Sequence, residues 1–322
     1  MHTVSGGRLF AAAALCASLP LAGCSGIGSG QTPGAASPGN SVGAASRNSV
    51  GAASLRSKLP DAKTTTPLLY MSDESTVYVY DQAKGAKPIS KITGFGDAFG
   101  LAVAPSGDLY VADLSGQVIQ VFHQGATTPY ETLTGATDPA GVALDTQGNV
   151  YANNWEGNEV YVFAAGSTTV TSTLVDTACV GCESNFMAVD AAGDVVSDYP
   201  GGQLDEFPAG ASSSPIELQS NTGNCEGLAF DGQQNLVISN ESVGFNIYAP
   251  PYTGKPAKTV KGKFEMQALA FTSDDSALWI AVTNHKYGLE LSYPALKTNE
   301  KTSGKELNTD IRGVATYPPA PI

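Results

Sequence analysis

Three features of this sequence have side chains whose types and spacing could do chemistry. Glu226 follows Cys225 in NTGNCEGLAFDG (221–232), where a carboxylate could be a metal ligand, a catalytic acid or a residue at the rim of a binding site. Cys179 and Cys182 form a C-x-x-C pair in ACVGCES. GNSVG at 39–43 matches the G-x-S-x-G pattern of serine hydrolases, but that motif needs a strand before the serine and a helix after it. The surrounding Gly/Ala/Ser-rich sequence predicts neither element, so we predict no catalytic residue there.

The segments that must position these residues are copies of one repeat. The copies are GLAVAPSGDLYVAD, GVALDTQGNVYANN, FMAVDAAGDVVSD, EGLAFDGQQNLVISN and QALAFTSDDSALWIA, and they share an alanine at steps of 41 to 45 residues. Each copy has a short apolar strand, a Gly/Asp/Asn turn and a second strand, followed by two further strand-like segments. Period-two alternation with frequent turn residues indicates antiparallel sheet, and four strands in a repeat of this length are typical of a β-propeller blade.

The two ends of the repeat region complement each other. PLLYMSD, TVYVYDQ and PISKITG, within 67–94, supply three strands without a first one, and RGVATYP at 312–318 supplies a first strand alone. Together they would make one blade, which closes the ring and removes its open edges. The predicted fold is therefore an all-β, six-bladed propeller of four-stranded antiparallel blades, spanning residues 62–322.

The sequence before the propeller predicts export. Residues 1–23 have a basic residue and then an apolar stretch too short to span a membrane, which is typical of a signal peptide. LAGC at 21–24 resembles the lipobox of bacterial lipoproteins, and that resemblance implies lipid attachment at Cys24. An ordinary secretory cleavage site is the alternative. Residues 24–61 repeat GAAS three times and predict a flexible tether. We therefore expect a lipid-anchored protein of the bacterial cell envelope.

Charge excludes one class of partner. Residues 61–322 contain 13 basic and 30 acidic residues, whereas a nucleic-acid-binding surface is basic. We expect a monomeric propeller that binds no nucleic acid and whose partner is an unknown protein or small molecule.

The repeats resemble the NHL family and its gluconolactonase-like and streptogramin-lyase-like relatives, most closely in GDLYVADLSGQVIQVF (107–122). Lactonase-type propellers, by this resemblance, bind one divalent metal through Glu, Asn and Asp residues just before the first strand of a blade. The equivalent positions here are Phe99, Ala140, Phe186, Glu226, Gln267 and Arg312. Only one is a carboxylate, whereas a hard cation requires several oxygen ligands, so we expect no metal and no cofactor.

The same positions predict a recognition site at the mouth of the central channel. Phe99 and Phe186 would form an apolar floor, and Glu226, Gln267 and Arg312 would provide polar groups. In the other interpretation, which the sequence slightly favours, the phenylalanines plug the channel and Glu226 pairs with Arg312. The sequence favours a non-enzymatic binding scaffold, and a lactonase- or lyase-like enzyme in the channel is the alternative function.

The cysteines leave two pairings open. Cys179, Cys182 and Cys225 lie in corresponding loops of neighbouring blades, so the sequence favours a bridge between blades that involves Cys225. A bridge within C-x-x-C is the alternative.

Overall fold

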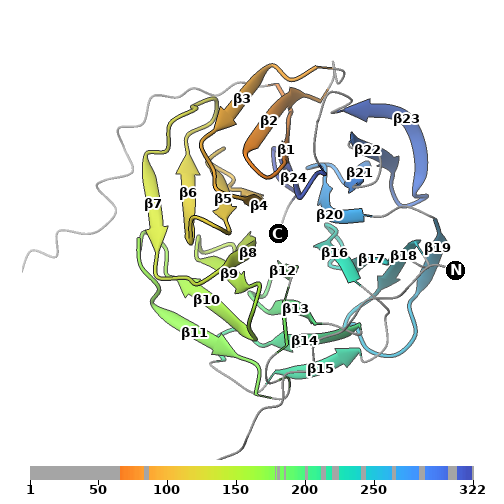
Figure 1. Ribbon diagram of the computed structural model, residues 1–322. Coiled ribbons are helices and arrows are strands. Elements are labelled where there is room, and N and C mark those ends of the chain that lie inside the picture. Colours follow the sequence, from red (N-terminus) through yellow and green to blue (C-terminus); the bar gives the residue numbers. More distant parts are fainter. Residues whose placement is uncertain are drawn as a thin grey trace, which may run out of the picture. The chain divides into compact units, whose positions relative to one another are not determined.

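The protein forms a six-bladed β-propeller (Figure 1). The computed structural model describes residues 66–82, 87–177, 179, 182–184, 186–199, 202–211, 215–219, 225–240, 244–262, 266–282, 287–303 and 310–320. These residues all lie in the compact unit Pro60–Ile322. The predicted signal peptide, Cys24 and the whole predicted tether lie outside the described residues. No helix long and apolar enough to cross a membrane occurs in the part of the chain that the structure describes.

Each blade is a four-stranded antiparallel sheet whose first strand lines the central channel. The first three complete blades run in chain order from the channel outwards. Their strands are β4 (Ala98–Val103), β5 (Leu109–Asp113), β6 (Val118–Phe122) and β7 (Glu131–Thr134); β8 (Pro139–Leu144), β9 (Val150–Asn154), β10 (Glu159–Phe163) and β11 (Ser172–Val175); and β12 (Met187–Val189), β13 (Val195–Tyr199), β14 (Gln203–Phe207) and β15 (Ile216–Gln219).

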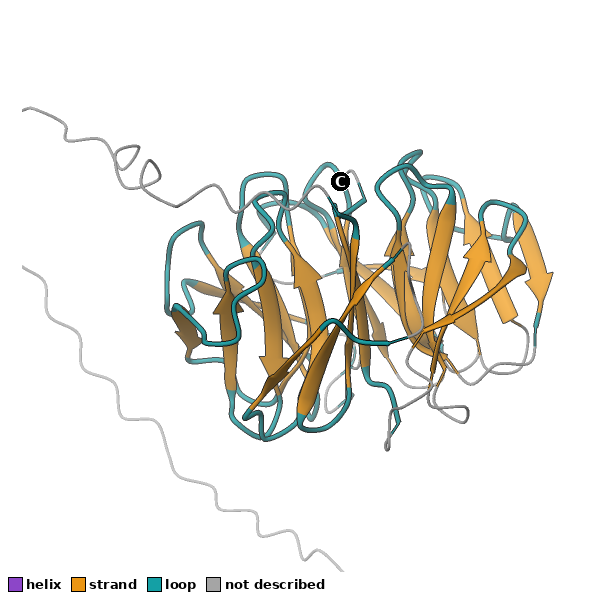
Figure 2. Cartoon of the chain, turned by 90° about the horizontal axis from the view of Figure 1, so that it is seen from above, coloured by secondary structure: helices purple, strands orange, loops and turns teal. Residues whose placement is uncertain are grey.

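The next two blades have the same order. They consist of β16 (Cys225–Phe230), β17 (Leu236–Asn240), β18 (Gly244–Tyr248) and β19 (Lys258–Lys261), and of β20 (Met266–Phe271), β21 (Ala277–Val282), β22 (Tyr287–Ser292) and β23 (Lys297–Ser303). Figure 2 shows the propeller unit edge-on, with the connecting loops gathered at the two ends of the strands.

The sixth blade joins the two ends of the propeller, as the sequence predicts. Its strand order is β24 (Gly313–Tyr317), β1 (Leu68–Ser72), β2 (Thr76–Asp81) and β3 (Ser90–Thr93). β24 pairs with β1 along its whole length, from Leu68 opposite Tyr317 to Ser72 opposite Gly313. We call this sheet the closing blade. Its pairing leaves no open edge in the ring.

The hydrophobic core is divided among the six seams between neighbouring blades, with one cluster of buried residues at each seam. β1 shows how alternation produces this division. Its residues Leu68 and Tyr70 belong to the cluster on one side of the blade, whereas Leu69 and Met71 belong to the cluster on the other side. Because side chains alternate across a strand, a strand between two blades is buried on both faces.

Glycine is required where the channel-lining strands approach each other. A Cβ atom on Gly100 of β4 would collide with the carbonyl oxygen of Ala140 in β8, and one on Gly313 of β24 would collide with the carbonyl oxygen of Phe99. The clashing atoms belong to the backbone and cannot swing aside. These contacts explain why a glycine precedes the shared alanine by two residues in several repeats.

Candidate recognition site at the channel mouth

The predicted site residues begin the channel-lining strands at one end of the propeller, which we call the channel mouth. Phe99 lies in β4, Glu226 in β16 and Gln267 in β20, while Phe186 and Arg312 directly precede β12 and β24. The side chains of Glu226 and Gln267 lie outside the described part of the structure. Their backbones place both residues at the same level of their strands as Phe99.

β-Bulges mark this level of the ring. The pairing between first and second strands shifts register between Ala98 and Leu101, between Pro139 and Val142, between Cys225 and Gly227, and between Met266 and Ala268. Each register shift falls at one of the aligned positions that the sequence places at the channel mouth. A bulge turns a side chain out of the regular alternation and is common beside binding sites. The bulges therefore mark the level at which the predicted site residues leave the regular strand alternation.

Aromatic rings pack at the mouth around Phe99. Its ring lies 5.0 Å from the ring of Trp155 in an edge-to-face arrangement and 6.2 Å from the ring of Phe186. Phe99 is only 2% exposed, so it forms the buried floor of the mouth and matches the plug interpretation at this one position. The sequence alignment missed Trp155 because it follows β9, the second strand of its blade, and so does not belong to the aligned positions.

Arg312 lies over this floor. Its guanidinium carbon is 5.6 Å from the centroid of the Phe99 ring, a cation–π contact, and its Nη2 atom is 3.3 Å from Oε1 of Glu74. The backbone N–H of Arg312 donates to the carbonyl oxygen of Ser72, which fixes the residue at the start of β24. The Nε atom of Arg312 is buried and has no hydrogen-bond partner among the described residues.

Asp97 completes the charged part of the mouth. Burial raises the pKa of its carboxyl group, the Arg312 guanidinium opposes that shift, and the Glu74 and Asp113 carboxylates add to it. Its Oδ1 atom is buried without a hydrogen-bond partner in the described chain. The mouth thus presents unsatisfied donor and acceptor atoms beside an aromatic floor, an arrangement suited to holding a polar group of a ligand.

Acids and amides at the ends of second strands position these residues. Asp113 accepts from the backbone N–H groups of Gly96, Asp97 and Gly116, and Asp198 accepts from the N–H of Phe186. These side chains bond the backbone and do not point jointly at a ligand. The role of these acids is therefore architectural. Within the described residues, no group of three or more His, Cys, Asp or Glu side chains is arranged to hold a metal ion.

Below the mouth, the channel contains a cavity of about 210 Å³ lined by small and apolar residues of the six first strands. Pro319 and Ala320, which follow β24, line the same cavity.

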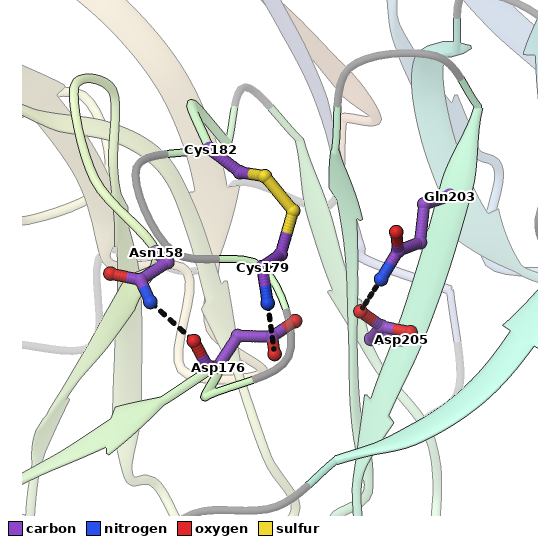
Figure 3. Close-up of a disulfide and its surroundings, with 6 residues drawn as sticks. All are labelled: Asn158, Asp176, Cys179, Cys182, Gln203 and Asp205. Atoms are coloured by element: carbon purple, nitrogen blue, oxygen red, sulfur yellow. Dashed lines mark hydrogen bonds between the residues drawn. A yellow bond between two sulfur atoms is a disulfide. The ribbon is translucent and has the colours of Figure 1, made fainter.

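The disulfide joins Cys179 to Cys182, with Cα atoms 5.6 Å apart (Figure 3). The favoured prediction, a bridge between blades through Cys225, is therefore wrong. Cys225 is 7% exposed, belongs to the apolar cluster of its seam, and lies with its Sγ atom 3.7 Å from the carbonyl oxygen of Gly227. Its side chain points into the core, whereas the other two cysteines lie in one loop and are close enough to pair.

Comparison with known proteins establishes the fold and no closer relationship. No family model matches the sequence, and no curated protein matches it. Among solved structures, a chain from the crystal structure of a nidogen/laminin complex is similar, with a TM-score of 0.64 over 78% of this chain and 98% of that chain. The two sequences are 14% identical, so the likeness shows the propeller fold alone.

Proposed function

We propose that this protein is a non-enzymatic binding scaffold of the bacterial envelope, in which the propeller holds a protein partner at the channel mouth. The observation that carries the proposal is the placement of Arg312: its guanidinium lies on the buried Phe99 ring while its Nε atom has no partner among the described residues. The Arg312 side chain is 25% exposed, so an acidic or amide side chain of a partner could accept from the exposed part of its guanidinium. Arginine beside aromatic rings is a common composition for the centre of a protein interface.

A protein partner is also in keeping with the similar solved structure, whose title describes a complex of nidogen with laminin. We propose by this analogy that the present propeller binds a protein. The resemblance of its repeats to NHL-type propellers supports the same class of function, because that fold presents loops and channel-lining residues without prescribing a reaction.

The lipobox resemblance supports the location. We propose that lipid on Cys24 anchors the chain and that residues 24–61 tether the propeller to the membrane. Several acyl chains on one cysteine would hold the protein firmly. Replacement of Cys24 by serine should move the protein from the membrane fraction to the soluble fraction. Retention in the membrane fraction would contradict the anchor.

The partner proposal can be tested by comparing proteins that co-purify with the wild type and with two mouth variants, Arg312→Gln and Trp155→Ala, after cross-linking in cells. We expect a specific protein to be lost with both variants. Tyr130→Ala is the control, because Tyr130 is 46% exposed and lies at the end of the strands opposite the mouth. A partner retained equally by all variants would show that the mouth is not its binding site.

A further inference from the structure

A second cavity lies between the closing blade and the blade formed by β4–β7, at the end of the propeller opposite the channel mouth. Its volume is about 290 Å³. Its walls include the buried apolar side chains of Leu68, Val79, Ile92, Leu109 and Phe122. An apolar cavity of about 150 Å³ can hold benzene, and pockets for drug-sized ligands begin near 300 Å³. The cavity thus has room for a molecule of roughly ten non-hydrogen atoms.

Two residues that line this cavity carry unsatisfied polar atoms. The Tyr70 side chain is 2% exposed, and its hydroxyl group has no hydrogen-bond partner within the described residues. The Nε2 atom of Gln124 is buried and likewise unpaired in the described chain. Buried donors without partners cost free energy, which an acceptor oxygen on a ligand would recover. The polar atoms therefore favour a ligand with a carbonyl or hydroxyl oxygen.

The charge around the cavity restricts the ligand further. Asp81 lines the wall and is 6% exposed. Asp108 contacts the wall residue His123, with its Oδ1 atom 3.0 Å from Nδ1 of His123. A carboxylate on the ligand would be repelled by these acids at low dielectric. The site therefore favours an uncharged molecule over a fatty acid of the same length.

Exposed hydrophobic side chains lie at the opening of the cavity. Ile89, which lines the cavity, is 60% exposed, and the ring of His123 stacks on the ring of Tyr130 at a centroid distance of 3.8 Å. Only three large hydrophobic side chains are exposed in the described part of the chain, and two of them, Ile89 and Tyr130, are at or beside this opening. Clustered exposed apolar side chains commonly mark a binding site.

We propose that this cavity, the inter-blade pocket, binds an uncharged, mainly aliphatic small molecule that carries one carbonyl or hydroxyl oxygen. The aliphatic part contacts the apolar walls, and the oxygen accepts hydrogen bonds from Tyr70 and Gln124. Binding involves no covalent step and is independent of the proposed partner at the channel mouth.

The test uses the full chain in detergent-free buffer and isothermal titration calorimetry with three matched probes: 1-octanol, 2-octanone and octanoate. We expect the alcohol and the ketone to bind with one site per chain. Octanoate should bind at least about tenfold more weakly at pH 7.5, because the nearby acids repel its carboxylate. A tenfold difference in affinity corresponds to about 1.4 kcal/mol. Failure of both neutral probes to bind would overturn the proposal. Equal binding of octanoate would overturn the argument from charge.

Two variants locate the site. Ala126→Phe places a ring at the rim of the pocket and should abolish binding, whereas Ser167→Phe makes the same change at the equivalent turn of the next blade and should leave binding intact. Tyr70→Phe should weaken octanol about three- to tenfold through loss of one hydrogen bond. Because Tyr70→Phe also removes a buried unsatisfied hydroxyl, the variant should melt at the wild-type temperature or above, which separates lost binding from lost folding. Octanol binding that survives Ala126→Phe would place the probe elsewhere and contradict the proposal.

Discussion

Asp176 and Asp205 are buried in neighbouring blades, close enough that the Asp176 carboxylate raises the pKa of the Asp205 carboxyl group. Asp176 directly follows β11, on the loop that carries the disulfide, and Asp205 lies in β14 (Figure 3). A second carboxylate nearby disfavours the charged form of a carboxyl group. Burial first, and then the interaction with Asp176, raises the pKa of Asp205 to about 7.

This pair predicts a pH dependence of stability. Because the folded-state pKa of Asp205 is raised above its unfolded value, the folded protein binds more protons than the unfolded chain between about pH 4 and pH 7. The free energy of unfolding should therefore fall as pH rises through this window. Urea denaturation at pH 4.5, 6 and 8 would measure the change. Asp205→Asn removes the titrating group, so its stability should depend less on pH, and an identical pH profile for both proteins would contradict the raised pKa of Asp205.

The cysteine pairing makes a second prediction. Peptide mapping without reduction should recover Cys179 linked to Cys182, and Cys225 should react with iodoacetamide only after unfolding. Cys179→Ser with Cys182→Ser should cost about 2 kcal/mol, because the closed loop is short and its entropy contribution is small. Cys225→Ala is the control that keeps the bridge. A linked peptide containing Cys225 would disprove this pairing.

A third prediction concerns the charges at the mouth. The Arg312 guanidinium opposes the rise in the pKa of Asp97, so Arg312→Met should raise that pKa further. Arg312→Lys keeps a positive charge and should have a smaller effect. A carboxyl ¹³C NMR titration of Asp97 would compare the three proteins. Stability should change by less than about 1 kcal/mol, because the Glu74 partner is largely exposed. An unchanged pKa in Arg312→Met would show that the two groups do not interact.

The close approach of the channel-lining strands makes a fourth prediction. Gly100→Ala should destabilise the propeller by about 1–3 kcal/mol, because the added Cβ meets the backbone oxygen of Ala140. Ala102→Gly, two residues further along β4, removes a methyl group without adding a contact and serves as the comparison. Chemical denaturation of both variants would measure the effect. Wild-type stability in Gly100→Ala would mean that the strands can separate freely.

Closure of the ring makes the fifth prediction. Removal of residues 312–322 deletes β24 and exposes the edge of β1, so the truncated chain should lose its cooperative thermal transition. Circular dichroism melting would show the loss, and addition of a peptide with the sequence of 312–322 should partly restore the transition. A truncated chain that melts cooperatively near the full-length temperature would contradict closure by β24.

The sequence predicts the features that repeat and misses those that do not. The shared alanines and the split blade could be recognised because every blade must present the same apolar strand to the same seam. The same alignment of the repeats predicts that Phe99 and Arg312 lie at one level, at the channel mouth. Trp155 was missed because it follows a second strand and so lies outside the aligned first-strand positions.

Contacts between unlike positions were also beyond the sequence. Asp176 and Asp205 occupy different strands of different blades, so no periodicity connects them. The choice between the two predicted disulfide pairings depended on the direction of the Cys225 side chain. The sequence leaves that direction open, because a buried strand residue can face either seam. The inter-blade pocket depends on the exact fit of two blades, which the pattern of apolar residues leaves open.

The position of Arg312 makes the proposed binding site depend on a complete propeller ring. It directly precedes β24 and contacts Glu74, which is 238 residues away in the sequence. The mouth is therefore assembled only when the last strand of the propeller has paired with the first. By mass action, a partner that binds Arg312 would stabilise the paired state and would bind only chains whose ring is complete. Partner binding at this mouth would thus distinguish a finished molecule from a partly folded or clipped one.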